Sequence, residues 1–565
     1  MRSLVPNLVP MAVLLPLLGA ALTLAFRRSP VLQRTISVGV LTTVVAVAAV
    51  LVQQTDAHGP QVLWLGAWPE PLGIALVADR LSALMLLVSA IVSLVVLVFA
   101  IGQGQADDEE EEDTPMSIFH PTYLVLMAGV SNAFLAGDLF NLFVGFEILL
   151  FSSYVLLTLG GTGPRIHAGT TYVVVSLVSS SLFLIAIASA YAATGTVNLA
   201  QLAVRIEGLP ANAALVVQLA LLTTFGIKAA VFPMSSWLPD SYPTAPAPVT
   251  AVFAGLLTKV GVYAIIRTQT LLFPESPLTG LLMWASLLTM IVGILGAVSQ
   301  TGLKRMLSFT LVSHIGYMIF GIALASEHGT AGAIFYVAHH ITIQTALFLI
   351  TGLVERLGGT TSLDRLGGLA AASPVLAILF FTSAMNLSGI PPLSGFLAKI
   401  GLLHAGLELG TPMAWVLVVA GIVTSLLTLY ALTKVWSQAF WRSAPKQAAG
   451  DEELDGTAGS EEFEMAPVPV GQGAAARTDS QGEALATGPR DFYTDPPRRR
   501  KTATAQVGRP LPKAMLWATA AMTAVGIVIT LVAGPLFAYT QRAAGDLMQR
   551  DPYINSVLPE EVLRR

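Results

Sequence analysis

The sequence predicts an all-α polytopic membrane protein. Of its 565 residues, 54% are hydrophobic and only 11% are charged, and the mean hydropathy is +0.71. A soluble globular domain carries roughly 25% charged residues, so the composition points away from that class and towards the bilayer. Long apolar stretches recur along the chain, and two of them are interrupted by clustered proline and glycine. Together these observations favour a bundle of membrane-crossing helices that break at defined places.

Apolar stretches of membrane-spanning length set the number of helices. A helix needs about 20 mostly apolar residues to cross a hydrocarbon core of roughly 30 Å, and by this criterion the chain has about 14 such helices. They are expected near residues 4–26, 35–53, 79–101, 117–136, 138–159, 167–193, 212–232, 243–269, 276–300, 303–325, 329–352, 373–402, 412–440 and 513–541. An even number of spans places both ends of the chain on the same side of the membrane.

The basic residues of the short loops predict the orientation. One side holds Arg27, Arg28, Arg34, Arg165, Lys304, Arg305, Arg356 and Arg365, and the other holds only Arg80, Arg205 and Arg267. The positive-inside rule assigns the first side to the cytoplasm, so both termini are expected to be extracytoplasmic. The first span could instead be a signal peptide, but it ends in Arg27-Arg28 rather than in a small-residue cleavage site.

Two charged segments divide the apolar stretches. Residues 102–116 contain the run DDEEEED and are expected to form an acidic cytoplasmic loop. Residues 443–512 are rich in Ala, Gly, Glu, Pro and Ser, which predicts a disordered cytoplasmic loop. The expected divisions are helices 1–3 in 1–101, a first five-helix repeat in 117–269, a second in 276–440, a last helix at 513–541 and an extracytoplasmic tail at 542–565.

Cysteine is absent from the sequence. Disulfides, thiolate zinc sites and cysteine-ligated iron–sulfur clusters are therefore excluded, and any redox chemistry would belong to a partner chain. We expect no cofactor and no metal site. The net charge of −4 is too small to suggest a nucleic-acid partner.

Ionisable side chains inside spans are the main functional candidates, because they are costly to bury in a membrane. Near the middle of predicted spans lie Glu147, Lys228, Lys259, His314, His339, His340 and Lys399. An unpaired carboxylate at the depth of Glu147 would become neutral, so this residue either takes up protons or pairs with a cation. Asp138 is a weaker candidate, because it lies near the end of a span.

Two spans are expected to be discontinuous. Pro233 and Pro239 follow Lys228, and Pro391 and Pro392 precede Lys399. Proline removes a backbone donor and breaks the helix, and the freed carbonyls provide polar contacts and attract water. Two proline-broken spans, each with a buried lysine, are typical of internal repeats in transporters. Spans four to eight would then repeat as spans nine to thirteen, and the odd number of helices makes the repeats inverted.

The histidines lie between the two breaks. Histidine titrates near neutral pH, so a line of Lys and His can pass protons through intervening water. Neighbours on a helix point about 100° apart, and we favour His340 over His339 because His340 shares a face with Gln344. For His314, a hydrogen-bonded structural role near Ser308 and Ser313 is an open alternative.

The segments GIKAAVFPMSSWLPDSYPTAPAPVTAVFAGLLTKVGVY, FNLFVGFE and PPLSGFLAK carry a resemblance to a known family. Over residues 70–440 the chain resembles the antiporter-like subunits shared by respiratory complex I and the Mrp-type multisubunit sodium/proton antiporters. Within that family, FNLFVGFEILLFSSYVLL is most similar to the D-type subunit of the Mrp antiporters. The resemblance implies fourteen helices with two inverted five-helix repeats, each with a discontinuous helix, in a bacterial cell membrane.

The resemblance also implies residue roles. Glu147 and Lys228 would form the charge pair that gates proton movement, Lys259 and His340 would be central relay positions, and Lys399 would be the terminal lysine. The sequence departs from the complex I pattern at Gln344, where those subunits usually have a lysine. His339, His314, Gln344 and Asp138 are additional relay candidates.

These expectations lead to three hypotheses. The first is a membrane subunit of a multisubunit cation/proton antiporter that couples proton uptake to sodium export and works with other membrane subunits, with no enzymatic activity of its own. The second is a proton-translocating membrane subunit of a respiratory dehydrogenase, with the redox chemistry on other chains. The third is an assembly scaffold that transports nothing.

Overall fold

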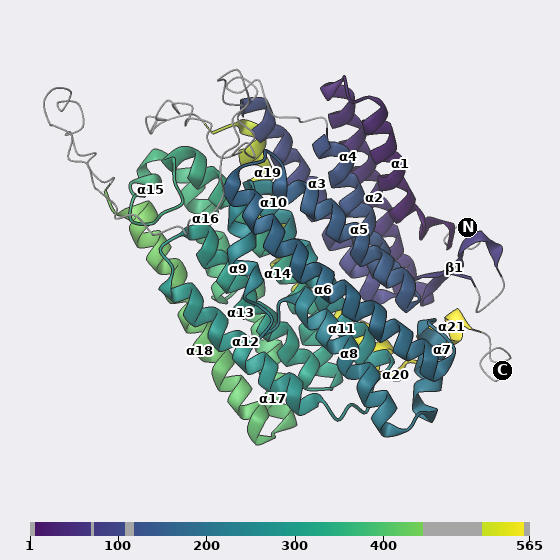
Figure 1. Cartoon of the computed structure of the whole chain (residues 1–565). Helices are drawn as coiled ribbons and strands as arrows, with labels where there is room; N and C mark the ends of the chain where they lie inside the picture. Colours follow the sequence, from purple (N-terminus) through teal and green to yellow (C-terminus); the bar gives the residue numbers. More distant parts are fainter. Residues whose placement is uncertain (1–5, 69–72, 108–117, 444–510, 559–565) are drawn as a thin grey trace, which may run out of the picture. The chain divides into compact units, whose positions relative to one another are not determined.

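The computed structural model describes residues 6–68, 73–107, 118–443 and 511–558, and almost all of them are helical (Figure 1). The helices of the first half are α1 (Met11–Ala25), α2 (Pro30–His58), α3 (Arg80–Asp107), α4 (Phe119–Leu135), α5 (Leu139–Thr158), α6 (Gly163–Thr194), α7 (Leu199–Arg205), α8 (Ala211–Ala229) and α9 (Trp237–Ser241). Those of the second half are α10 (Ala247–Val252), α11 (Thr258–Leu271), α12 (Thr279–Ser299), α13 (Leu303–Ala323), α14 (Glu327–Gly358), α15 (Leu369–Ala372), α16 (Pro374–Ser388), α17 (Ser394–Leu409), α18 (Pro412–Val435), α19 (Lys513–Leu531), α20 (Ala533–Gln549) and α21 (Asp551–Val557).

Within the described residues, 12 helices are long and apolar enough to cross a membrane. The predicted spans at 117–136 and 373–402 correspond to the shorter α4 and to the broken pair α16 and α17. The prediction of an all-α polytopic membrane protein is therefore confirmed. Most of the predicted loops at 102–116 and 443–512 lies outside the described residues.

Local sequence explains where several spans begin. Ser29, Ser373 and Thr411 each cap a helix by accepting a hydrogen bond from a backbone N–H of its first turn. Each is followed by a proline, whose missing N–H and fixed φ suit the first position of a helix. A serine or threonine cap followed by proline thus fixes the first residue of α2, α16 and α18.

The last predicted span, 513–541, is wrong in its extent. α19 ends at Leu531, and a new helix, α20, starts at Ala533 and continues to Gln549. Pro535 lies in the first turn of α20, where proline is tolerated, but it could not continue α19. α20 also carries Arg542 and Asp546, which are too polar for a span, so part of the predicted tail is a packed amphipathic helix.

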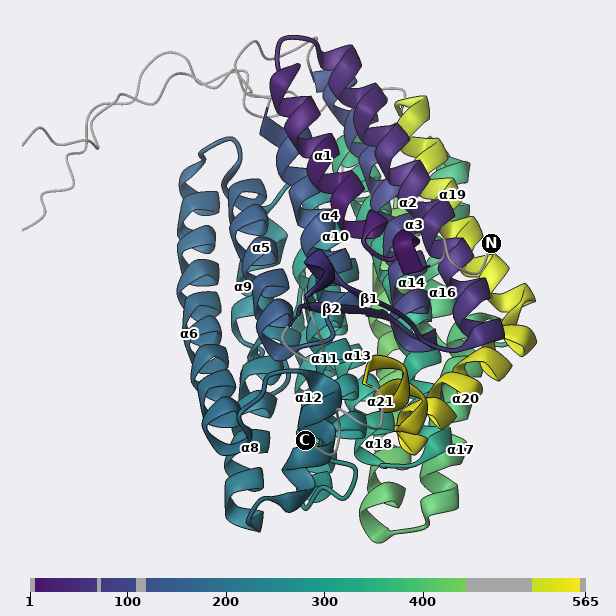
Figure 2. The ribbon, with the colours of Figure 1, turned by 90° about the vertical axis from the view of Figure 1, so that its right-hand side faces the viewer.

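A β-hairpin, which the sequence analysis did not predict, follows α2. Strands β1 (Gln61–Trp64) and β2 (Ala75–Ala78) pair antiparallel, with Gln61 opposite Ala78. Two further extended segments join this layer, because Ala136 bridges to Leu76 and Asp138 bridges to Asn198. Figure 2 shows the hairpin beside α21, and we call this end of the molecule, formed by β1, β2, α7 and α21, the hairpin end.

The helices α10, α11, α13 and α14 form the centre of the bundle. Their apolar lengths are almost completely enclosed by other helices. The single helix α14 packs against several others, among them α3, α13, α16, α17, α19 and α20. In contrast, α6, α12 and α18 expose large apolar side chains such as Val178, Trp284 and Leu426, as expected of surfaces that face lipid.

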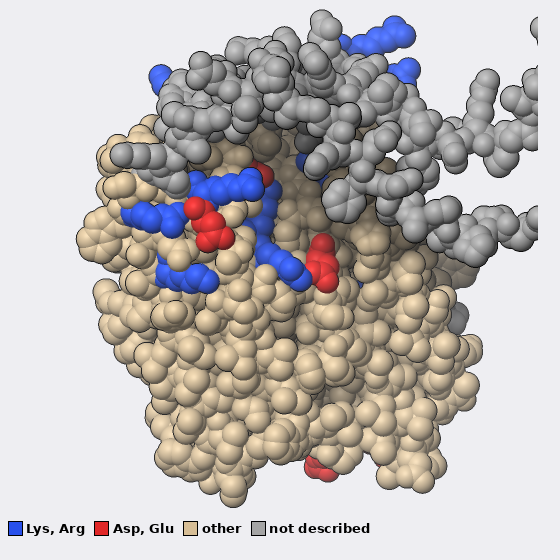
Figure 3. All heavy atoms as spheres, turned by 60° about the vertical axis from the view of Figure 1, so that its left-hand side comes forward, with Lys and Arg blue, Asp and Glu red and all other residues tan. Residues whose placement is uncertain are grey.

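Charged side chains on the surface in Figure 3 gather towards one end, and most of the remaining surface is apolar or uncharged. The ion pairs Lys304–Glu355, at 2.7 Å, and Arg305–Asp240, at 2.9 Å, lie where α13 begins and α14 ends. This end, opposite the hairpin end, carries basic residues that the positive-inside rule assigns to the cytoplasm. The orientation itself stays a prediction.

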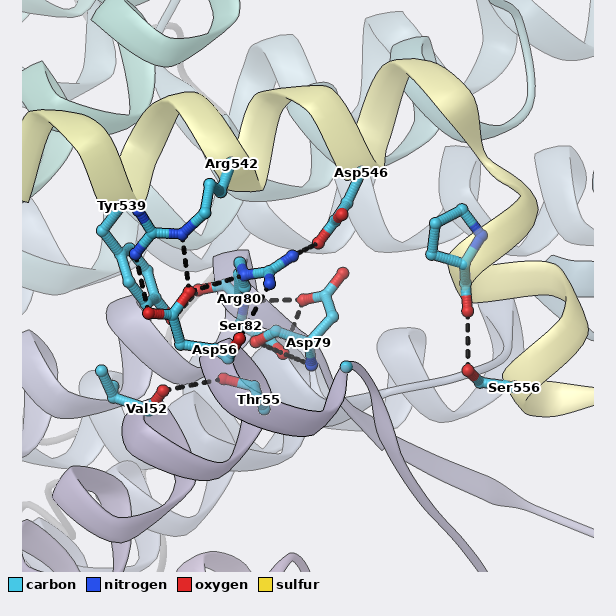
Figure 4. Close-up of polar contacts among 12 residues, drawn as sticks. Val52, Thr55, Asp56, Asp79, Arg80, Ser82, Tyr539, Arg542, Asp546 and Ser556 are labelled. Carbon is cyan, nitrogen blue, oxygen red and sulfur yellow. Dashed lines mark hydrogen bonds and ion pairs between the residues drawn. The ribbon is translucent and has the colours of Figure 1, made fainter.

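At the hairpin end, Arg80 connects helices that are distant in the sequence (Figure 4). Its guanidinium pairs with Asp56 of α2 at 2.9 Å and with Asp546 of α20. Arg542, also on α20, pairs with Asp56 at 2.7 Å. These ion pairs tie α20 to the start of α3 and the end of α2.

A further ion pair, between Asp79 and Arg267, lies deeper in the bundle. Asp79 accepts hydrogen bonds from Arg267 of α11 through both of its oxygens, at 2.6 and 2.8 Å. The two side chains are buried, and the Arg267 guanidinium lies 5.0 Å from the centre of the Tyr553 ring. Asp79 and Arg267 thus join the segment before α3 to the centre of the bundle.

Candidate functional site

The first helix break lies directly after Lys228. α8 ends one residue later, and Ala230 adopts a left-handed conformation with φ of 57°. Its backbone N–H donates to a carbonyl in the last turn of α8, which satisfies an acceptor left free at a helix end. Pro233 lies in the irregular segment that follows. Pro239 lies further on, in the first turn of the short helix α9, where its missing N–H leaves no helical hydrogen bond unmade.

The side chains of Glu147 and Lys228 meet at Ser180 of α6. The Ser180 hydroxyl is hydrogen-bonded to Glu147 Oε1 and accepts a hydrogen bond from Lys228 Nζ at 3.2 Å. Lys228 Nζ also lies 3.4 Å from the Ser176 carbonyl oxygen. The acid and the base are therefore bridged by a hydroxyl, which can donate to one while it accepts from the other. The sequence analysis paired Glu147 with Lys228 and missed Ser180.

A small cavity lies beside this pair. Its volume is about 30 Å³, and Phe146, Tyr172 and Trp237 line it together with Lys228. A buried water needs roughly 10–15 Å³, so the cavity admits water next to the amine. Lys228 Nζ lies 5.7 Å from the centre of the Phe146 ring. The lysine therefore has both a water-sized space and an aromatic wall at the helix break.

Lys259 lies at the centre of the bundle, fully buried on α11. A π-helical turn, Phe253–Leu257, separates α10 from α11 and shifts the backbone hydrogen bonds just before this lysine. Lys259 Nζ donates to the Ala254 carbonyl within that turn. The hydroxyl of Thr258 has no hydrogen-bond partner among the described residues. The structure thus places a primary amine beside a local irregularity in the middle of the molecule.

His314 and His340 form an aromatic cluster with Tyr336. The hydroxyl of Tyr336 is hydrogen-bonded to His314 Nδ1 at 2.8 Å, and His314 Nε2 lies 3.4 Å from the Thr428 hydroxyl. The rings of His314 and His340 are 5.1 Å apart, and neither nitrogen of His340 has a partner among the described residues. Gln344, one turn further on, donates to the Leu307 carbonyl at 2.8 Å.

The hydrogen bonds of His314 do not involve Ser308 or Ser313, the two serines that the sequence suggested as its partners. Ser308 donates to Lys304 O and Ser313 donates to Met290 O, so neither serine bonds to His314. Its observed partners come instead from α14 and α18. Tyr336 was missed, although a tyrosine one turn before two buried histidines is a readable signal.

The second break connects to His339 rather than to His340. α16 ends at Ser388, and α17 starts at Ser394, whose hydroxyl is hydrogen-bonded to His339 Nδ1 at 3.0 Å. Lys399 Nζ donates to the carbonyls of Leu387 and Ser388, both at 3.0 Å. These carbonyls belong to the last turn of α16, so the lysine of α17 binds the acceptors that the break frees.

Tyr317 links the cluster to the second break. Lys399 Nζ lies 5.2 Å from the centre of its ring, and that ring stacks on Tyr336 at 5.3 Å. These contacts connect Lys399 through Tyr317 and Tyr336 to His314 and His340. Glu147 and Lys228 form a separate group at the first break, and Lys259 is buried on α11, so the order of these groups in a relay stays a prediction. Asp138 lies apart from both groups, at the hairpin end, where it bridges to Asn198.

Buried titratable side chains beside two broken helices, in a bundle of many spans, define an ion-transporting membrane protein of the antiporter-like class. The family model of the NADH:quinone oxidoreductase/Mrp antiporter transmembrane family matches residues 136–428, and the chain belongs to this family. It is 41% identical over 438 residues to the D-type subunit of the Na(+)/H(+) antiporter of Alkalihalophilus pseudofirmus, a match that covers 77% of this chain and 87% of that relative. The corresponding Bacillus subtilis protein is 38% identical over 438 residues, with the same coverage.

Solved structures of related complexes contain chains with the same fold. A chain in the structure of the Mrp complex from Dietzia sp. superimposes with a TM-score of 0.83 and 32% identity, covering 98% of this chain and 99% of that one. Respiratory complex I from Thermus thermophilus contains a chain with a TM-score of 0.72 and 23% identity, which shows a common fold. The resemblance to the D-type subunit of the Mrp antiporters is confirmed.

Proposed function

We propose that this chain is the proton-carrying D-type subunit of a multisubunit sodium/proton antiporter. Glu147 and Lys228 form its gating pair, Lys259 and His340 its centre, and Lys399 its terminal group. The observation that carries the proposal is the shared hydrogen bonding of Glu147 and Lys228 to Ser180, beside a water-sized cavity at a broken helix. The remaining predicted groups, Lys259, His340 and Lys399, are also buried in the bundle.

The Ser180 bridge supports a gating role on physical grounds. A carboxylate and an ammonium stabilise each other, and each loses that stabilisation when its partner changes protonation state. An ion that favours one charge state of the pair therefore shifts its equilibrium, but only by its differential affinity for the two states. Because Ser180 can reverse its hydrogen-bond direction, the pair can exchange a proton with little rearrangement.

The relatives support the cation and the partners. Two relatives that match over 87% of their length are named as the D-type subunit of an Na(+)/H(+) antiporter, and a similar chain of known structure belongs to a Mrp complex. We infer that this chain works with other membrane subunits in a bacterial cell membrane, with both termini extracytoplasmic and no catalytic activity of its own. The likeness to complex I supports only the fold, so the respiratory alternative is second.

The decisive experiment compares Glu147→Gln and Lys228→Ala with the matched control Glu355→Gln, which removes a carboxylate from an ion pair at the cytoplasmic end. Sodium-dependent pH changes are measured in everted membrane vesicles that contain the whole complex. A positioned proton-transfer group typically contributes roughly 10²–10⁴-fold, so each relay variant should lose at least about 100-fold in rate. The control should keep its rate, and all three should assemble.

Full activity of either relay variant would exclude the pair from the mechanism. Wild-type activity in Glu147→Gln, Lys228→Ala and Lys399→Ala would indicate that the chain is an assembly scaffold instead. Absorbance of the purified complex separates the second hypothesis, since flavin and iron–sulfur bands belong to a respiratory dehydrogenase and not to an antiporter.

A further inference from the structure

Asp138 lies at a junction of three chain segments at the hairpin end. It precedes α5 and bridges to Asn198, which precedes α7, while the neighbouring Ala136 bridges to β2. The backbone N–H groups of Leu139 and Leu199 complete this pairing through the carbonyls of Val197 and Gly137. Asp138 is thus held by backbone pairing on both sides.

Only one of the two carboxylate oxygens of Asp138 is used within the described residues. Oδ1 caps α5 by accepting a hydrogen bond from the Asn141 backbone N–H at 2.6 Å. Oδ2 is buried and has no hydrogen-bond partner there, although the side chain is only 6% exposed. A buried carboxylate oxygen without a donor is unfavourable, so this atom points to a ligand.

Three further polar groups near this carboxylate are also unpartnered among the described residues: Asn141 Nδ2, Asn198 Nδ2 and the Tyr553 hydroxyl, each on a side chain more than nine-tenths buried. The oxygen of each amide is already hydrogen-bonded, and this fixes the orientation of the amide. Asn141 Oδ1 accepts from Asn132 Nδ2 at 3.0 Å, and Asn198 Oδ1 caps α7. Their N–H groups are therefore the free side.

These amide N–H groups favour a bound water that carries a proton over a bound sodium ion. A hard cation takes oxygen ligands, and amide N–H groups would repel it. A water molecule instead accepts from the amides while it donates to Asp138, and it delivers or removes a proton there. Clusters of three or more acidic, histidine or cysteine side chains that could hold a metal ion are absent from the described part of the chain.

The charged side chains on the elements around Asp138 have other partners: Arg550, which donates to the Ala203 carbonyl of α7, pairs with Glu207. Arg267, beyond the Tyr553 ring, is neutralised by Asp79, and Arg205 of α7 donates to the Thr194 carbonyl. Strand β2 contributes no ionisable side chain. Asp138 itself precedes α5 and lies outside the spans, and burial raises its pKa to about 6, against the opposing effect of two backbone N–H groups.

We propose that Asp138 is a proton-binding carboxyl at the hairpin end, where protons pass between the extracytoplasmic water and the buried relay. This inference rests on the proposed function. Tyr263 connects the end of α4, near Asp138, to the helix that carries Lys259. Its hydroxyl donates to the carbonyl of Phe134, and it lies one turn of α11 from Lys259.

The test uses Asp138→Asn in the intact complex, because asparagine caps a helix as well as aspartate does but binds no proton in this pH range. Transport is measured while the pH on the extracytoplasmic face is varied from about 5 to 7, one unit either side of a pKa near 6. The variant should lose that pH dependence and roughly 10²-fold of its rate, and Asp138→Glu should restore both. Glu207→Gln is the control, since Glu207 is an exposed carboxylate at the same end.

Infrared difference spectroscopy of the same pH steps provides a readout without transport. The wild type should show a carboxyl that titrates in this range, and Asp138→Asn should lack it. An unchanged pH profile and spectrum in Asp138→Asn would overturn the inference, as would a change in sodium affinity alone. If Asp138→Asn behaves as wild type while Glu147→Gln is inactive, only this inference fails; if Glu147→Gln is also active, the proposed function fails.

Discussion

Replacing Ser180 by alanine isolates the hydroxyl that bridges Glu147 and Lys228. The change removes two hydrogen bonds to charged groups, each worth about 1.5–3 kcal/mol. The adjacent cavity of about 30 Å³ admits a water that can replace part of this loss. We therefore expect a net loss close to that of one such bond, which corresponds to a roughly 10- to 150-fold lower transport rate.

The assay is sodium-dependent dissipation of a pH gradient in everted vesicles, scaled to the amount of assembled complex. Ser179→Ala is the matched control, because the Ser179 hydroxyl donates to the Thr224 carbonyl, away from the charge pair. Ser180→Thr keeps a hydroxyl and should recover most of the rate. A wild-type rate in Ser180→Ala, with Ser179→Ala equally unaffected, would refute the view that the pair communicates through this hydroxyl.

Three further predictions concern stability, measured by thermal and denaturant unfolding in detergent. Ala230→Val should destabilise the chain by about 1–3 kcal/mol, since a β-branched residue is strained at a φ of 57°. Gly395→Ala should cost at least about 3 kcal/mol, because a Cβ there would lie 1.9 Å from the Asn386 carbonyl oxygen. Arg267→Met should cost about 3–5 kcal/mol by leaving Asp79 buried without its partner.

Each has a control. Ala230→Gly should be tolerated, because glycine adopts this backbone freely. Gly280→Ala should be neutral, since a Cβ there has no neighbour within 4 Å among the described residues. Stabilities of these two that match those of Ala230→Val and Gly395→Ala would contradict the strain and the close approach.

The ion pair of Asp79 and Arg267 should make the stability of the chain depend on pH. Burial alone would raise the pKa of Asp79, but the charge and hydrogen bonds of Arg267 outweigh it and hold the pKa below 3.8. Its contribution to stability is therefore present above the unfolded pKa and is lost as the pH falls below about 4. Asp79→Asn should remove that acid-dependent part, and an identical acid profile in wild type and variant would contradict it.

Properties encoded locally were predictable from the sequence. Spans follow from apolar length, and the breaks near Pro233 and Pro391 follow from the missing backbone donor. Buried lysines and histidines stood out because of the cost of placing charge in a membrane. For this reason the candidate residues came from the sequence even though their order in space did not.

Partners separated in the sequence were not predictable. Ser180 is 33 residues from Glu147 and 48 from Lys228, and nothing local distinguishes it from the neighbouring Ser179. The hairpin strands are only four residues long, and their pairing depends on extended segments near Ala136 and Asn198. The choice between His339 and His340 as relay residue also depends on tertiary contacts, because both are buried.

The ion pair between Arg80 and Asp546 imposes an order on biogenesis, because 466 residues separate its two members. A ribosome that adds roughly 5–20 residues per second takes about 20–90 s to cover that distance. During this time Asp56 is already inserted and can hold Arg80, but α20 does not yet exist to complete the ion pairs. Closure of the hairpin end must therefore be among the last steps of folding, after the helices of the buried relay have been synthesised.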